Sequence, residues 1–170
     1  MARQPGNRSA AEQHGEIPGI SLASAYVILA EIGTGMTRFP AAGHLASWAR
    51  LAPGITESAA KKNGKGSTGH GNAYLASVLG NAAAGAAKTS TFPGEKYRRI
   101  ARRRGPKRAI VALGRSILVT SWHLLSDPGA RFYDLGPGYH TARTGPERRN
   151  RRHVRELEAL GYTGTLKPAS

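Results

Sequence analysis

The strongest constraint on the fold is one long apolar repeat between residues 106 and 126. Its large apolar side chains recur mostly every three or four residues, which places them on one face of an α-helix. Pro106 is typical of a first helical position, and Asp127-Pro128-Gly129 predicts where the helix ends. The expected apolar face consists of Ile110, Leu113, Ile117, Leu118, Trp122 and Leu125.

Helices are predicted in four other stretches, and none shows the two-residue alternation of a half-buried strand. These stretches are residues 22–32, 41–51, 72–88 and 93–104. Small residues in the third permit close packing against a neighbouring helix, and both Trp48 and Trp122 are expected in the core. The expected buried stripe of the first consists of Leu22, Tyr26 or Ala25, Leu29 and Ile32. The fold class is therefore all-α, with one compact helical domain over residues 17–126.

The two ends of the chain are expected to be largely unpacked. Gly (22) and Pro (10) are frequent among the 170 residues, above the average share of about 12%. Residues 1–16 are polar and predict a disordered lead. Residues 127–170 are rich in Gly, Pro and Arg and predict a basic, largely disordered tail, with a weak helical patch at 148–160.

Charge points to a polyanionic partner. Lys and Arg number 25 against 10 Asp and Glu, so the net charge is +15. Sixteen of these cations fall in residues 94–155, in blocks too dense to bury. Nucleic acid is the expected partner, and an anionic membrane surface is the weaker alternative. We expect neither a transmembrane segment nor a signal peptide, because no apolar run is long enough and the N-terminus is polar.

Several classes of site are excluded by residue type or spacing. The absence of Cys excludes disulfides, thiolate zinc sites, iron–sulfur clusters and cysteine nucleophiles. The six His lack zinc-binding spacings, and the acidic residues are scattered, so no metal site is predicted in this chain. The run Gly64-Lys65-Gly66-Ser67 lacks the full phosphate-loop pattern, which excludes nucleotide hydrolysis.

Two segments could contact nucleic acid besides the basic helix. The turn Pro18-Gly19-Ile20-Ser21 resembles the hairpin of helix-hairpin-helix DNA-binding elements, where close-approaching backbone and free N–H groups hold phosphate. A plain helix start is the equal alternative. Lysines on a glycine-rich connector over residues 53–70 suit phosphate contacts, although a solvated linker has the same composition. The candidate contacts are Gly19, Ile20, Ser21, Lys61, Lys62, Lys65, His70, Asn72, Arg98, Arg99, Arg102 and Arg103.

An ordered set of motifs over residues 17–126 resembles the C-terminal domain of transposases of the IS110/IS116/IS902 insertion-sequence family. That set includes Ile17-Pro18-Gly19-Ile20, Ile28-Leu29-Ala30-Glu31-Ile32-Gly33, Leu45-Ala46-Ser47-Trp48-Ala49, Leu51-Ala52-Pro53, Ser58, Gly69-His70-Gly71-Asn72 and Lys107-Arg108-Ala109-Ile110. The resemblance implies that Ser58 is the catalytic nucleophile on a DNA phosphate. The reaction it implies is strand cleavage and rejoining through a phosphoserine linkage.

The resemblance also implies partners. Family members carry an N-terminal RuvC-like domain whose acidic residues bind divalent metal, and a structured RNA guides them. We therefore expect Mg²⁺ only together with that domain, which we expect to be missing ahead of the Pro-Gly-Ile turn. The chain is expected to be a truncated copy that is inactive alone. Its expected partners are DNA, a guide RNA, and a second copy or a full-length transposase, in the bacterial cytoplasm on the nucleoid and without a membrane.

Three positions depart from the family pattern, and other functions stay open. Family members usually have Gly where this chain has Arg50 and Ala59, and Arg where it has Ala76. The alternative function is a non-enzymatic, helix-hairpin-helix-like module that binds DNA or RNA. A basic ribosome-associated protein is a weaker alternative, since it would explain the charge and not the ordered motifs.

Overall fold

The structure is a computed structural model that describes residues 9–51, 71–143 and 145–163. Within these ranges every regular element is a helix and none is a strand, so the all-α prediction is confirmed. The elements are α1 (Ala10–Gly15), α2 (Leu22–Ile32), the 3-10 turn η1 (Met36–Arg38), α3 (Ala42–Trp48), α4 (Ala73–Ala87), α5 (Phe92–Arg104), α6 (Pro106–Ser126), α7 (Tyr139–Ala142) and α8 (Pro146–Ala159).

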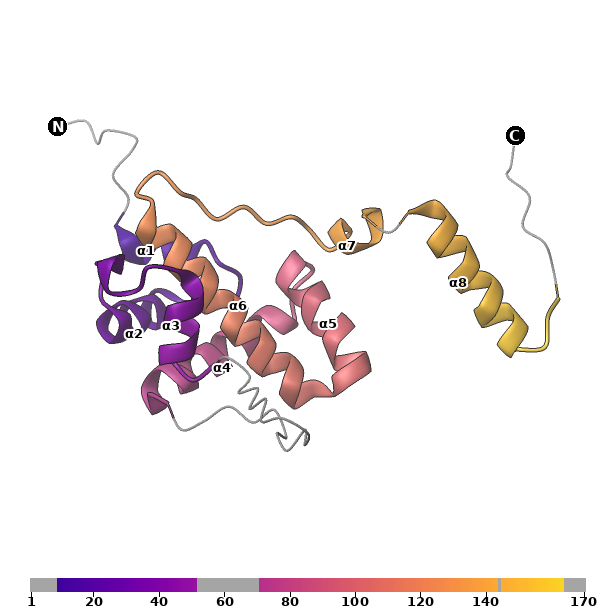
Figure 1. Cartoon of the computed structure of the whole chain (residues 1–170), viewed down its shortest axis with the longest axis horizontal. Helices are drawn as coiled ribbons and strands as arrows, with labels where there is room; N and C mark the ends of the chain where they lie inside the picture. The colour runs from indigo at the N-terminus through magenta and orange to yellow at the C-terminus, as the bar shows by residue number, and fades with distance from the viewer. Residues whose placement is uncertain (1–8, 52–70, 144, 164–170) are drawn as a thin grey trace, which may run out of the picture.

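Helix α6 is the centre of the bundle. It packs against α3, α4 and α5 and also meets α1 (Figure 1). Contrary to the expectation that no apolar stretch is long enough, α6 is by length and composition able to cross a membrane, yet its buried face lies inside the protein, as in the core helix of a bundle. The buried face consists of Ala109, Leu113, Gly114, Ile117, Leu118, Ser121 and Leu124.

Small residues bring α4 close to its neighbours, as the sequence predicts. Ala82, Ala83 and Ala86 are fully or almost fully buried. A Cβ added at Gly114 of α6 would lie 3.5 Å from the carbonyl oxygen of Leu79 on α4. The α6 backbone approaches α4 closely at this point because Gly114 has no side chain.

The predicted buried stripe of α2 is partly wrong. Leu22 and Tyr26 are exposed, at 52% and 59%, whereas Ala25, Ile28 and Ile32 are buried. Helix α2 lies between α1 and α4, and the small Ala25 side chain faces that contact. Periodicity places apolar residues on one side of a helix, but which of two adjacent stripes is buried depends on the partner helices.

Trp48 also departs from prediction, since its side chain is 37% exposed and not in the core. Trp122 follows the prediction more closely. It packs against the core, and its indole nitrogen donates a hydrogen bond to the carbonyl oxygen of Phe39 at 2.8 Å.

The N-terminal lead is ordered from residue 9 onward, so the prediction of disorder is wrong for residues 9–16. Ser9 and Glu12 form a reciprocal capping box at the start of α1. Ala11 and His14 are buried against the rest of the bundle. Residues 1–8 lie outside the described part of the chain.

The tail contains two helices, so the expectation of a largely disordered tail is wrong for α7 and α8. Helix α8 coincides with the predicted patch at 148–160. Between α6 and α7 the chain is extended, and Phe132 packs against the core while Asp134 accepts a hydrogen bond from the Phe92 amide. Helix α8 stands away from the bundle (Figure 1).

Candidate nucleic-acid interface

The hairpin turn joins two helices that pack together, as a helix-hairpin-helix arrangement requires. Gly19 has φ +89°, and a Cβ there would overlap the carbonyl oxygen of Ala82 and lie 2.6 Å from the amide nitrogen of Ala86. Ile20 is buried, and the Ser21 hydroxyl caps α2 by accepting the Ser24 amide at 3.1 Å. Each of the three predicted contact residues therefore has a structural role.

The described residues on either side of the Ser58 segment lie close together. Ser58, Lys61, Lys62, Lys65 and His70 lie outside the described residues. The chain leaves the described part after Leu51 and returns at Gly71. A Cβ added at Gly71 would lie 2.6 Å from the Ala49 carbonyl oxygen, so both ends of the segment meet at the end of α3.

Helix α3 ends in a Schellman motif whose left-handed position is Arg50. The Leu51 amide donates to Ala46, the Arg50 amide donates to Ser47, and Arg50 has φ +56°. Glycine adopts this conformation freely, whereas another residue there costs roughly 1–2 kcal/mol. That conformation is a physical reason for the glycine that family members usually have at this position.

Asn72 is tied to the protein on both sides of its amide. Its Oδ1 atom caps α4 by accepting the Leu75 amide at 3.0 Å, and its Nδ2 atom donates to Glu31 on α2. Asn72 therefore positions the start of α4 relative to α2. Its predicted contact with nucleic acid would have to be made alongside these two bonds.

The predicted cations of α5 differ in availability. Arg98 is held by Glu95 at 3.1 Å and donates to the Thr89 carbonyl oxygen at 3.2 Å. Arg99, Arg102 and Arg103 are exposed, and their spacing of three and four residues places them on one face. Arg98 therefore has a structural role, whereas the other three present free charge to solvent.

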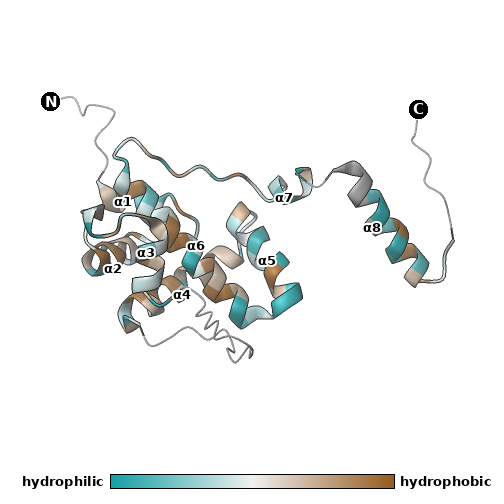
Figure 2. Cartoon of the chain, viewed as in Figure 1, coloured by the Kyte–Doolittle hydropathy of each residue, from teal (hydrophilic) through white to brown (hydrophobic). Residues whose placement is uncertain are grey.

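Further exposed cations extend this face onto α6, and the sequence predictions missed them. Arg104, Lys107, Arg108 and Arg115 are all exposed. The missed signal is the polar side of the 106–126 repeat, where Arg108 and Arg115 recur seven residues apart. Figure 2 shows the hydrophilic colour over the last turns of α5, where the chain enters α6. We call Arg99, Arg102, Arg103, Arg104, Lys107, Arg108 and Arg115 the basic face.

Neighbouring positive charges help to lower the pKa of two groups beside the basic face, Lys96 and His140. Burial lowers the pKa of Lys96, and the neighbouring Arg99 and Arg115 lower it further. The Lys96 ammonium donates to the Ser116 hydroxyl at 2.6 Å and lines a cavity of about 370 Å³ beneath residues 130–135. Burial also lowers the pKa of His140, with Arg99 and Lys96 acting in the same direction. A bound phosphate would relieve this repulsion.

The described residues do not fit a divalent metal centre. Among residues 9–51, 71–143 and 145–163, no three His, Asp or Glu side chains gather closely enough to hold an ion. The carboxylates are engaged separately: Glu31 with Asn72, Glu95 with Arg98, and Asp134 with the Phe92 amide. This part of the chain offers no set of converging oxygen ligands of the kind that Mg²⁺ prefers.

Comparison with known proteins identifies the family. Residues 13–99 match the model of the transposase IS116/IS110/IS902 family, a match that spans half of the chain. The match runs from α1 through the hairpin, the Ser58 segment and most of α5, and stops before α6. No match is found among curated proteins or among solved structures. The match with the family model shows that this chain belongs to the transposase IS116/IS110/IS902 family.

Proposed function

We propose that the chain works as the DNA-binding, serine-bearing domain of a transposase, with Ser58 as its nucleophile. The observation that carries DNA binding is the basic face, whose exposed cations lie on two consecutive helices in a chain of this family. Such a surface suits backbone phosphates and carries no base-specific readout by itself. The lysines at 61, 62 and 65 and His70 add contacts in the same proposal.

The hairpin is proposed as a second, smaller phosphate contact. Gly19 packs against α4, Ile20 is buried and the Ser21 hydroxyl caps α2, so only backbone N–H groups at the start of α2 are offered to DNA. Helix N-termini bind phosphate through such groups. The arrangement of α1, the turn and α2 supports this role.

The proposed chemistry is phosphoryl transfer to a serine and back. The Ser58 hydroxyl oxygen forms a bond to phosphorus, and the bond from phosphorus to one strand oxygen breaks. The serine proton is removed as the bond forms, and the departing strand oxygen gains a proton. A hydroxyl of a second strand then attacks the phosphoserine and releases Ser58, so the number of phosphodiester bonds is conserved.

The proposal includes partners for the steps that this chain does not supply. Divalent metal and its carboxylate ligands would come from a full-length transposase acting with this chain, and an element-encoded guide RNA would select the target. A second copy is a further candidate partner. The place of action is the bacterial nucleoid in the cytoplasm.

Trapping of a covalent adduct tests the catalytic part. Purified protein is mixed with labelled element-end DNA, guide RNA, Mg²⁺ and a full-length relative that carries its own Ser→Ala change. We expect a labelled adduct on this chain that Ser58→Ala abolishes. Ser67→Ala, in the same segment, is the matched control and should leave the adduct intact. An adduct that survives Ser58→Ala would contradict the assignment.

The non-enzymatic DNA- or RNA-binding module remains the second candidate, because the basic face alone supports it. Both functions predict affinity that falls with salt, with a slope of roughly −0.9 per duplex phosphate neutralised. The Ser58→Ala variant distinguishes the two functions. If the chain is a transposase, the variant keeps DNA binding and loses the adduct, whereas a binding module forms no adduct with or without the substitution.

A further inference from the structure

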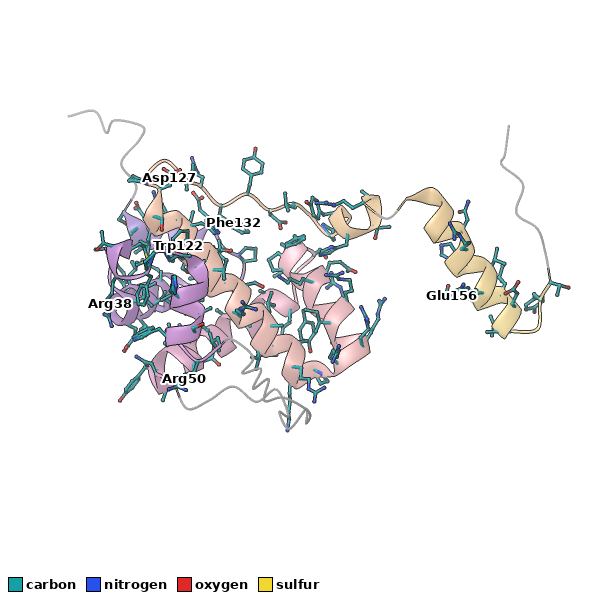
Figure 3. The ribbon with its side chains drawn as sticks, in the orientation of Figure 1. Arg38, Arg50, Trp122, Asp127, Phe132 and Glu156 are labelled. Carbon is teal, nitrogen blue, oxygen red and sulfur yellow. The ribbon has the colours of Figure 1, made fainter. Side chains whose placement is uncertain are left out.

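We propose that Arg38, Trp48, Arg50 and Tyr74 form a stacking surface for single-stranded DNA, which we call the aromatic platform. It lies at the junction of η1, α3 and the start of α4. Figure 3 shows Arg38 and Arg50 on the side of the bundle away from α5, the helix that carries Arg99, Arg102, Arg103 and Arg104 of the basic face. The proposal deepens the proposed function and rests on it for the choice of DNA.

Trp48 is the centre of the platform. Its side chain is 37% exposed although it ends a helix of the bundle. The Phe39 ring packs against it at 5.5 Å between centroids, with the planes tilted by 55°. The Arg38 guanidinium lies 5.4 Å from the Trp48 ring centroid and 5.3 Å from that of Phe39. One large ring is therefore held against a cation while part of it stays open to solvent.

The support beneath this ring is firmly anchored. Met36 and Phe39, which flank Arg38 along the chain, are both buried. The Phe39 carbonyl oxygen accepts the indole N–H of Trp122 at 2.8 Å, which joins η1 to α6. Because the Trp48 ring is already held in place, the protein loses little additional side-chain entropy when a ligand stacks on it.

Arg50 adds a second cation two residues from Trp48. Its backbone is left-handed, a conformation that glycine adopts without strain, and its side chain is exposed. The strained backbone therefore carries an exposed, charged side chain. A cation at this point is accounted for by a ligand with negative charge.

Tyr74 is the fourth residue of the platform. It follows the Ser58 segment in the chain, whereas Trp48 and Arg50 precede that segment. It lies on the first turn of α4, three residues after Gly71, whose backbone packs against Ala49. Its ring is 75% exposed. Among the residues that the structure describes, the acidic group in this region is Glu31, which is half-buried and hydrogen-bonded to Asn72. The outward charge of the platform is therefore positive.

Exposed rings next to guanidinium groups match the chemistry of unpaired nucleotides. Bases in a duplex are stacked on each other and offer no free ring face, whereas an unpaired base can stack on tryptophan or tyrosine. The phosphates between unpaired bases then meet Arg38 and Arg50. Strand exchange exposes such unpaired DNA, so single-stranded DNA is the occupant that the proposed function provides.

Tryptophan fluorescence of the full chain tests the platform. A deoxythymidine strand of about 12 nucleotides is titrated into the protein, with a ribo-strand and a duplex of equal length in parallel. We expect the single DNA strand to quench the emission, and Trp48→Phe to remove the quenching because only Trp122 then reports. Affinity measured by anisotropy should fall roughly tenfold in Trp48→Leu and much less in Trp48→Phe, which keeps a ring.

Arg50 supplies a variant that separates binding from folding. Arg50→Gly relieves the left-handed strain, so Tm should stay the same or rise while affinity for the DNA strand falls. Its salt slope should become shallower by about 0.7, the value for one phosphate of a single strand. Arg50→Lys should bind as the unchanged protein does. The matched aromatic control is Tyr133→Leu, since that side chain is 85% exposed outside the platform.

Three results would overturn the platform: no quenching by the DNA strand, preference for the ribo-strand, or equal losses of duplex and single-strand affinity in Trp48→Leu. Failure of the proposed function looks different. If the basic face does not bind DNA, duplex affinity is absent while quenching by the single strand persists. If Ser58 is not the nucleophile, the adduct is absent while both affinities persist.

Discussion

The hairpin and the basic face were both predicted to contact nucleic acid, and the structure uses their residues in opposite ways. In the hairpin, Gly19 touches α4, Ile20 is buried and Ser21 caps a helix. On the basic face, Arg99, Arg102 and Arg103 are exposed, and Arg99 together with Arg115 lowers the pKa of the partly buried Lys96. Packing and capping account for the hairpin residues, whereas no hydrogen bond or ion pair among the described residues accounts for Arg99, Arg102 and Arg103.

The largest effect should come from Gly19→Ala, which tests the packing role of the hairpin. The new Cβ overlaps α4 and the residue has φ +89°, so we expect a loss of about 3–5 kcal/mol in unfolding free energy. Gly33→Ala is the control for backbone strain alone, because Gly33 has φ +77° and ψ 171° with open space around it, and it should lose less, about 1–3 kcal/mol. Chemical denaturation measures both, and equal losses would show that packing against α4 is unimportant.

Next in size is the effect of removing charge from the basic face. Changing Arg99, Arg102 and Arg103 together to Gln should weaken duplex binding roughly a hundredfold near physiological salt and reduce the salt slope by about 2.7. Unfolding free energy should not fall, since these side chains are exposed. Arg131→Gln, which removes a cation paired with Glu16 at 2.7 Å on the extended segment, is the control for affinity. An unchanged salt slope in the triple variant would move the DNA site elsewhere.

The smallest predicted effect is on the pH dependence of stability. It concerns His14, which lies in α1 just before the hairpin turn. His14 is buried, its Nδ1 atom donates to the Ala10 carbonyl oxygen at 2.6 Å, and burial lowers its pKa below 6.5. As the pH falls, His14 is therefore protonated in the unfolded chain before it is protonated in the folded protein. The stability that the neutral imidazole contributes is fully present above pH 6.5 and is lost as the pH falls through the acidic range.

Thermal unfolding between neutral and acidic pH measures this decline. His14→Met should flatten it, and the remaining slope includes His140, whose pKa burial also lowers. A slope unchanged in His14→Met would mean that the buried imidazole contributes nothing to acid sensitivity. Bound DNA should reduce only the part of the pH dependence that His140 contributes, since that group lies beside the basic face.

Much of the helical framework was predictable because helix signals are local. The 106–126 repeat, its first residue Pro106 and the breaker after Ser126 define α6 as the structure has it. Helix α1 was missed even though Ser9 and Glu12 have the spacing of a capping box. Its polar composition hid the two residues, Ala11 and His14, that reach the core.

The candidate site was less predictable, because availability depends on contacts between distant residues. Asn72 and Arg98 have the right chemistry for phosphate, yet Asn72 donates to Glu31 and Arg98 donates to the Thr89 carbonyl oxygen, partners that the sequence pattern did not indicate. The exposure of Trp48 and its contact with Arg38 arise where α3 meets η1. No periodic signal marks such a junction.

The sequence by itself determined where the helices lie, how much positive charge the chain carries and which family motifs it holds. These properties depend on residue type and on spacing within a few turns. Only the tertiary structure decided which face of α2 is buried, that the two ends of the Ser58 segment meet, and which cations stay free. Those outcomes depend on which helices pack together, since burial and pairing are set by neighbours far away in the chain.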